Sequence, residues 1–178
     1  MAILFDQTAG DKTKETKNTK YMYDGNEHAV WDIANKDIIL NRRNKITLIV
    51  VGGYELYIDP ATGYVEGISG YENHEYWKHQ KIKLPKVKKG SVSAINMPND
   101  VHGREHIEES IPRGLKPAGT LYDRGSLLLL IGKKARSVYQ IDKGVFAGLK
   151  KGRITSLYFT GIKISDPSVM SPHRVGRS

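Results

Sequence analysis

The chain has 178 residues, of which 39% are hydrophobic, and this length and composition suit one globular domain with a core of its own. It contains no cysteine, which excludes a disulfide framework, a thiolate nucleophile and a zinc site with cysteine ligands. The net charge of +9 favours polyanionic partners. Because the apolar runs are too short for a membrane span and no signal peptide is recognisable, we expect a cytoplasmic protein without membrane contact.

Both ends of the chain are predicted to extend from a single domain. Residues 7–20 consist mainly of Thr, Lys and Gly, and residues 166–178 contain two prolines and no apolar periodicity. We therefore divide the chain into a polar N-terminal arm at 1–20, a β-rich domain at 21–165 and a C-terminal extension at 166–178. The two extensions are expected to bind other protein subunits, either further copies in a homo-oligomer or a different protein.

The first predicted elements are a short helix and a buried strand. Ala29, Val30 and Ile33 recur at helical spacing, and Asn26 can cap the N-terminus before them, which predicts a helix over 26–36. Residues 46–51 are β-branched and almost entirely apolar, which is typical of a central strand covered on both faces.

Two strand patterns follow in the middle of the chain. Residues 54–68 are predicted to form a hairpin, because Pro60 suits the first corner of a turn and Gly63 suits a positive φ at its exit. Lysines and apolar residues then alternate over 81–84, and Pro85 shifts this alternation by one position. Such a break predicts an edge strand or a β-bulge.

The C-terminal third is expected to consist of strands. Apolar runs predict strands at 127–131, 138–141 and 154–164, and a second hairpin is predicted to turn at 150–152. The predicted fold class is therefore mainly β. We expect a single β-sandwich or partly open barrel with one or two short helices and extended termini.

Charged residues are strongly segregated along the sequence. Residues 54–75 contain five acids and no Lys or Arg, residues 76–99 contain six lysines and no acid, and residues 133–153 contain seven cations and one acid. One interpretation places the acidic hairpin and the basic segment on neighbouring strands, where opposite charges stabilise pairing by roughly 0.2–1 kcal/mol. Another brings the acidic segment of one subunit against the basic segment of the next.

A third interpretation joins both cationic segments in one basic surface that attracts phosphate backbones without reading base sequence. Tyr76 and Trp77 precede the lysines and are candidates for base stacking, and Trp77 equally suits a position in the core. The candidate polyanion-binding residues are Lys81, Lys83, Lys86, Lys88, Lys89, Lys133, Lys134, Arg136, Lys150, Lys151 and Arg153.

The histidines provide the candidates for catalysis. On a helix, His102, His106 and Glu109 would share one face and could hold a metal ion, and the same segment offers Glu105 beside His106 for nuclease or other hydrolase chemistry. Gly103 within this segment argues against a helix, and the pattern departs from that of zinc proteases. We therefore assign no catalytic or metal-binding residue and expect no cofactor.

The sequence as a whole favours a non-enzymatic binding or assembly module. We expect it to dock to partner subunits and to contact a polyanion such as nucleic acid through its lysine-rich face. The alternatives are a small hydrolase that uses His102, Glu105 and His106, and a neutraliser of an acidic partner protein that uses the same lysine-rich face.

Overall fold

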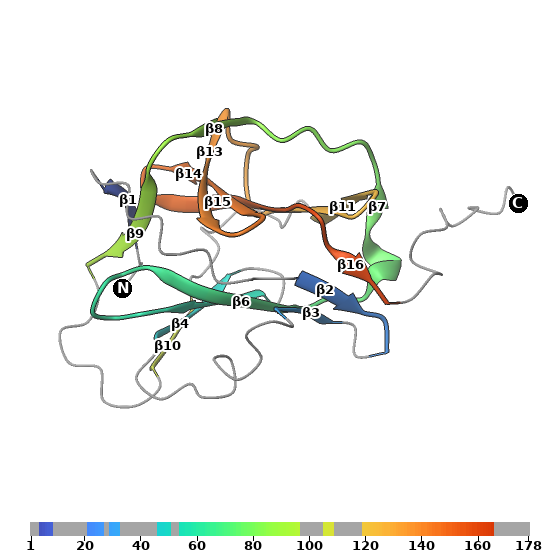
Figure 1. The fold of residues 1–178 in the computed structure, drawn as a ribbon, viewed down its shortest axis with the longest axis horizontal. Helices are drawn as coiled ribbons and strands as arrows, with labels where there is room; N and C mark the ends of the chain where they lie inside the picture. The colour runs from blue at the N-terminus through green and yellow to red at the C-terminus, as the bar shows by residue number, and fades with distance from the viewer. Residues whose placement is uncertain are drawn as a thin grey trace, which may run out of the picture.

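Two seven-stranded sheets lie face to face in the computed structural model, which describes residues 4–8, 21–26, 29–32, 46–50, 54–96, 105–108 and 119–165 (Figure 1). The first sheet has the order β10 (Glu105–Glu108), β4 (Ile46–Val50), β5 (Tyr54–Ile58), β6 (Val65–Tyr71), β3 (Ala29–Asp32), β2 (Tyr21–Asp24) and β16 (Lys163–Ile164). The second has the order β7 (Lys78–His79), β11 (Gly119–Asp123), β12 (Ser126–Leu130), β15 (Arg153–Phe159), β14 (Val145–Lys150), β13 (Ser137–Asp142) and β8 (Lys86–Lys88).

The main core fills the space between the two sheets. Tyr54, Leu56 and Ile68 enter it from the first sheet. Leu127 and Leu157 enter it from the second. These side chains are fully buried, and their alternation along each strand is the period of two that a β-strand imposes. The predicted β-sandwich is therefore confirmed.

The helix predicted over 26–36 is wrong for the part of it that the structure describes. Residues Ala29–Asp32 form β3, which pairs antiparallel with β2, with Val30 opposite Tyr23. Asn26 does not cap a helix, because its backbone N–H donates to Oδ1 of Asp24 in the turn between the two strands, at 2.9 Å. The helical spacing covers only a few apolar residues, and pairing with β6 on one side and β2 on the other favours a strand instead. Residues 33–36 lie outside the described ranges.

In the described ranges the one helical turn is the 3₁₀ helix η1 (His74–Tyr76), and no helix there is long and apolar enough to cross a membrane. The structure places β4 inside the first sheet, between β10 and β5, as its apolar sequence predicts. The strand predicted at 154–164 is divided, because β15 ends at Phe159 and β16 begins at Lys163 in the other sheet. Gly161, with φ at 72°, lies at this crossing.

Both predicted hairpins are present. At the first, the backbone N–H of Gly63 donates to the carbonyl of Asp59 at 2.7 Å, and Gly63 has the expected positive φ of 70°. A side chain there would also meet the carbonyl oxygen of Ala94, so both the turn and its neighbour require glycine. At the second, Lys151 and Gly152 have φ angles of 51° and 75°, which suit a tight two-residue turn.

The N-terminal boundary differs from the one drawn at residue 21. Residues Leu4–Thr8 form β1, which pairs antiparallel with β9 (Ser91–Ile95), and Phe5 is buried in the main core. The backbone N–H of Phe5 also donates to the carbonyl of Gly152 at 2.7 Å. This part of the predicted arm therefore belongs to the domain, because its apolar residues find partners far along the chain. Residues 9–20 and the extension at 166–178 lie outside the described ranges.

Candidate polyanion-binding surface

An extended segment crosses the outer face of the second sheet and joins its two edge strands. This strap, residues 80–85, leaves β7 at one edge and enters β8 at the other (Figure 1). Seven residue steps from His79 to Lys86 reach at most about 25 Å. Six strand spacings along a flat sheet cover about 29 Å, so the two edges of this sheet must lie closer together than in a flat sheet.

Side chains of the strap alternate between the sheet and the solvent. Ile82 and Leu84 are partly buried against a second apolar cluster on the outer face of the sheet, which includes Leu128 and Tyr158. The lysines at positions 81 and 83 are exposed on the other side of the strap. The alternating pattern that suggested a strand therefore has a different cause here, because residues 81–85 pair with none of the strands that the structure describes. The edge strand predicted around Pro85 is confirmed at β8.

Cations from neighbouring strands meet at one end of the second sheet. The parallel pairing of β13 with β8 puts Lys86 opposite Ser137, the residue that follows Arg136. In the adjoining hairpin, Lys150 on β14 pairs with Arg153 on β15. On its other side β14 pairs with β13, with Gly148 opposite Val138. Continuing this register by two residues places Lys150 opposite Arg136. Four adjacent strands therefore present cations at the same end of the sheet. This row is about 15 Å long, since neighbouring strands lie about 4.8 Å apart.

We call the combined strap, edge strand and turns the basic surface. Its members are Lys81, Lys83, Lys86, Lys88, Lys89, Lys133, Lys134, Arg136, Lys150, Lys151 and Arg153, all of them exposed. Within the described part of the chain these side chains make no ion pair, and Lys88 places its ammonium group over the Tyr139 ring, 5.5 Å from the centroid. The strand pairing therefore brings cations of the two predicted blocks to the same end of the second sheet.

The acidic hairpin does not pair beside the lysines. Strands β5 and β6 belong to the first sheet, whereas β8 pairs with β13 in the second, so the predicted cross-strand charge pairing does not occur. Some of the acids instead bind local donors. Asp59 accepts the hydroxyl of Thr62 at 2.8 Å, and Glu75 accepts the side-chain amide of Asn73 at 3.0 Å.

The two aromatic candidates differ in their surroundings. Tyr76 is 75% exposed, on the same chain segment as the first lysines, and its ring is available for stacking. Trp77 is only 5% exposed and contacts Tyr23 and Tyr122 in the main core, with ring centroids 4.6 and 5.6 Å away. Of the two interpretations of Trp77, the structure supports the position in the core.

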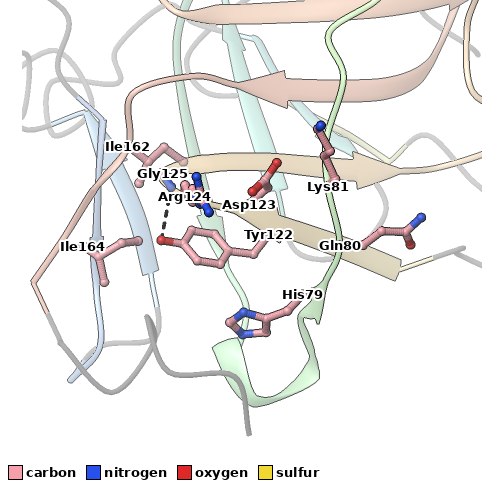
Figure 2. A pocket seen from close by; sticks show the side chains of 9 residues that line it. All are labelled: His79, Gln80, Lys81, Tyr122, Asp123, Arg124, Gly125, Ile162 and Ile164. Carbon is pink, nitrogen blue, oxygen red and sulfur yellow. Dashed lines mark hydrogen bonds between the residues drawn. The ribbon is translucent and has the colours of Figure 1, made fainter.

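A pocket of about 610 Å³ adjoins the beginning of the strap (Figure 2). It is lined by residues 79–81, by residues 122–125 in the turn between β11 and β12, and by Ile162 and Ile164. Hydrogen bonds join these segments: the backbone N–H of Ile82 donates to Oδ2 of Asp123 at 2.9 Å, and that of Ile162 donates to the carbonyl of Gly125 at 2.8 Å. The walls of the pocket are therefore held in place before any ligand binds.

A half-buried carboxyl group links the two sheets near this region, because Glu72 contacts Thr120 on β11 and Tyr54 on β5. Glu72 accepts the hydroxyl of Thr120, at 2.8 Å to Oε1 and 2.6 Å to Oε2, and the hydroxyl of Tyr54 at 3.4 Å. Burial raises the pKa of the Glu72 carboxyl above its ordinary value, although the hydroxyl donors oppose this effect. Neither this group nor the pocket was predicted, because both depend on residues from distant strands. Only the Asp-Arg-Gly sequence at 123–125 marked a turn in advance.

The described part of the histidine segment is a strand, in agreement with the argument from Gly103 against a helix. Residues Glu105–Glu108 form β10, which pairs parallel with β4. His102 and Glu109 lie outside the described ranges. No group of three or more His, Asp or Glu residues suited to a metal ion occurs among the residues that the structure describes.

The comparisons do not assign the chain to a family. No protein-family model matches it, and a search of the curated proteins found no significant relative. The function must therefore be inferred from the surface and the pocket themselves.

Proposed function

We propose that the protein is a binding module that contacts a polyanion, with nucleic acid as the leading candidate, through the basic surface. The observation that carries this proposal is the gathering of both cationic blocks on the second sheet, one on the strap and one at the sheet end where β8 begins. A surface of this kind binds phosphates by releasing counterions, which gives affinity without sequence selection. Docking to partner subunits remains part of the proposal.

The fixed spacing of the cations supports a polymer rather than a single small anion. The strap lies on an apolar cluster, so Lys83 is exposed on a segment whose neighbours Ile82 and Leu84 are held against the sheet. Cations on a positioned backbone lose less conformational entropy on binding than cations on a free chain. The exposed ring of Tyr76 adds a surface on which a base of a single strand can stack.

The test is binding of fluorescently labelled single- and double-stranded DNA and RNA, measured by anisotropy over a series of salt concentrations. We expect affinity that varies little with sequence and falls with salt, with a log–log slope of about −0.7 to −0.9 for each phosphate contacted. Reversal of Lys83 and Lys86 to Glu should weaken binding at least 10-fold. The matched control is K143E/K163E, which changes the net charge equally at exposed positions outside the basic surface.

Equal loss in both double variants would show an effect of net charge alone and would contradict a defined surface. Absence of salt-sensitive binding to any nucleic acid would direct the proposal to an acidic protein partner instead. Thermal midpoints should change little in either variant, because exposed charges contribute little to folding.

A further inference from the structure

The pocket beside the strap combines features that suit a small planar anion. Its volume, about 610 Å³, lies within the usual range of small-ligand sites, roughly 300–1,000 Å³. Its lining includes two cations, Lys81 and Arg124, the aliphatic side chains of Ile162 and Ile164, and the imidazole ring of His79. The cations suit a phosphate group, and the aliphatic and aromatic side chains suit a ring.

The arrangement of these groups separates the charged and the ring-binding sides. Figure 2 shows the ring of Tyr122 between His79 on one side and Arg124 and Lys81 on the other. The Tyr122 ring is buried and held by its neighbours: its hydroxyl accepts the backbone N–H of Gly125 at 3.1 Å, and the His79 ring meets it edge-on at 5.4 Å. A ligand that spans the pocket would therefore meet a ring-lined wall at one end and cations at the other.

We propose that this pocket binds one nucleoside monophosphate unit, with its base against His79 and Ile164 and its phosphate toward Arg124 and Lys81. The inference rests on the proposed function, because Lys81 belongs to both the pocket and the basic surface. A nucleotide at the end of a bound strand could therefore enter the pocket while the strand continues along the strap. Asp123 supplies an acceptor for a hydroxyl or amino group of the nucleotide, since the Ile82 N–H occupies only its Oδ2.

Two turns of the second sheet offer a closely matched pair of variants. Arg124 and Lys143 are both exposed, and each lies between an aspartate and a glycine of positive φ, Gly125 at 82° and Gly144 at 73°. Arg124 itself has φ at 45°, a conformation that Asn tolerates well, so Arg124→Asn and Lys143→Asn each remove one charge from a turn that accepts Asn. Arg124 lines the pocket, whereas Lys143 belongs neither to the pocket lining nor to the basic surface.

The experiment is isothermal titration of the full chain with AMP, adenosine and inorganic phosphate, each alone. Adenosine and phosphate should each bind the wild type at least 10-fold more weakly than AMP. We expect R124N to weaken AMP binding at least 10-fold and to leave adenosine binding unchanged, while K143N binds AMP like the wild type. Circular dichroism melts of both variants confirm that they are folded, and the comparison of the three ligands on the wild type needs no variant.

Failure of AMP to bind the wild type at millimolar concentration overturns the pocket assignment, and so does an equal loss of AMP binding in R124N and K143N. Salt-sensitive binding of a nucleic acid polymer in either case leaves the proposed function standing. If AMP binds as expected but no polymer does, the pocket is a small-ligand site and the polymer proposal is the one that fails.

Discussion

The hydroxyl groups of Tyr158 and Ser156 are buried near each other, and among the described residues neither has a hydrogen-bond partner of good geometry. A buried donor without a well-placed acceptor destabilises a fold, because it loses its hydrogen bonds to water. Burial raises the pKa of the Tyr158 phenol above its ordinary value, although the Ser156 hydroxyl opposes this effect.

Tyr158→Phe should therefore leave the free energy of unfolding unchanged or raise it by up to about 1 kcal/mol. The control is Tyr57→Phe, since the Tyr57 hydroxyl donates to Oε2 of Glu55 at 2.5 Å and lies 2.8 Å from Oγ of Ser69. Loss of these contacts should lower the free energy of unfolding by about 1–2 kcal/mol. Urea denaturation of both variants measures the difference, and a destabilised Y158F would show that the hydroxyl has a partner in solution.

Glu72 makes stability depend on pH. Its pKa in the folded protein is raised from the ordinary value of 4.5, chiefly by burial. Between the two pKa values the folded chain holds a proton that the unfolded chain has released, so the free energy of unfolding falls as pH rises through this window. Below the unfolded pKa both states are protonated, and this loss of stability is absent.

The change Glu72→Gln removes the titrating group and keeps an oxygen that can accept the Thr120 hydroxyl. The stability of E72Q relative to the wild type should therefore increase as pH rises from about 4 toward neutral. Thermal or urea unfolding of both proteins across that range measures this. A difference that stays constant with pH would mean that the carboxyl titrates alike in the folded and unfolded chains.

At the scale of elements, the strap should contribute to stability through its apolar residues and to binding through its lysines. Ile82 packs against the outer cluster, so Ile82→Ala should lower the free energy of unfolding by about 1–3 kcal/mol. The control is Val87→Ala on β8, where the side chain is 42% exposed, and its effect should stay below about 0.5 kcal/mol. Equal stability of both variants would show that the strap does not cover the sheet in solution.

Elements with strong local sequence patterns were predictable. The turn at 59–63 contains both the residue that fixes its first corner and the glycine that its exit requires, so the hairpin is specified within a few residues. Residues 29–32 were not predicted as a strand. One of their partners, β6, is distant in sequence, and the other, β2, was not recognised as a strand. The strap was not predicted for a related reason. The alternation of apolar and charged residues shows that one side of the segment is covered, but it does not show whether the segment is a strand within a sheet or lies across the face of one.

The candidate site was predictable only in its charge. The two lysine-rich blocks are visible in the sequence, but their meeting depends on the parallel pairing of β8 with β13, which no local pattern specifies. The burial of Glu72 likewise depends on Thr120, 48 positions away, and nothing in the acidic segment distinguishes this residue from the other acids.

For the whole molecule, the testable question is assembly. The described domain ends at Ser165, whose backbone N–H donates to the carbonyl of Tyr23 at 3.0 Å. A chain that stops after Ser165 should therefore keep its thermal midpoint. We expect it to form smaller assemblies than the full chain in light scattering at two salt concentrations, with and without nucleic acid. A full-length chain that is a monomer at every concentration would refute assembly through this extension.

The strap also has a consequence for the order of folding. The five central strands of the second sheet come from residues 119–159, and three pairs of them, β11–β12, β13–β14 and β14–β15, are joined by short connections. Such local pairs form quickly, whereas the strap comes from more than thirty positions earlier and has no surface to bind until β12 and β15 have paired. We therefore expect its contacts to form late, after the rate-limiting step. Interactions that form late slow unfolding without speeding folding, so a polyanion bound across the strap would lengthen the lifetime of the folded chain.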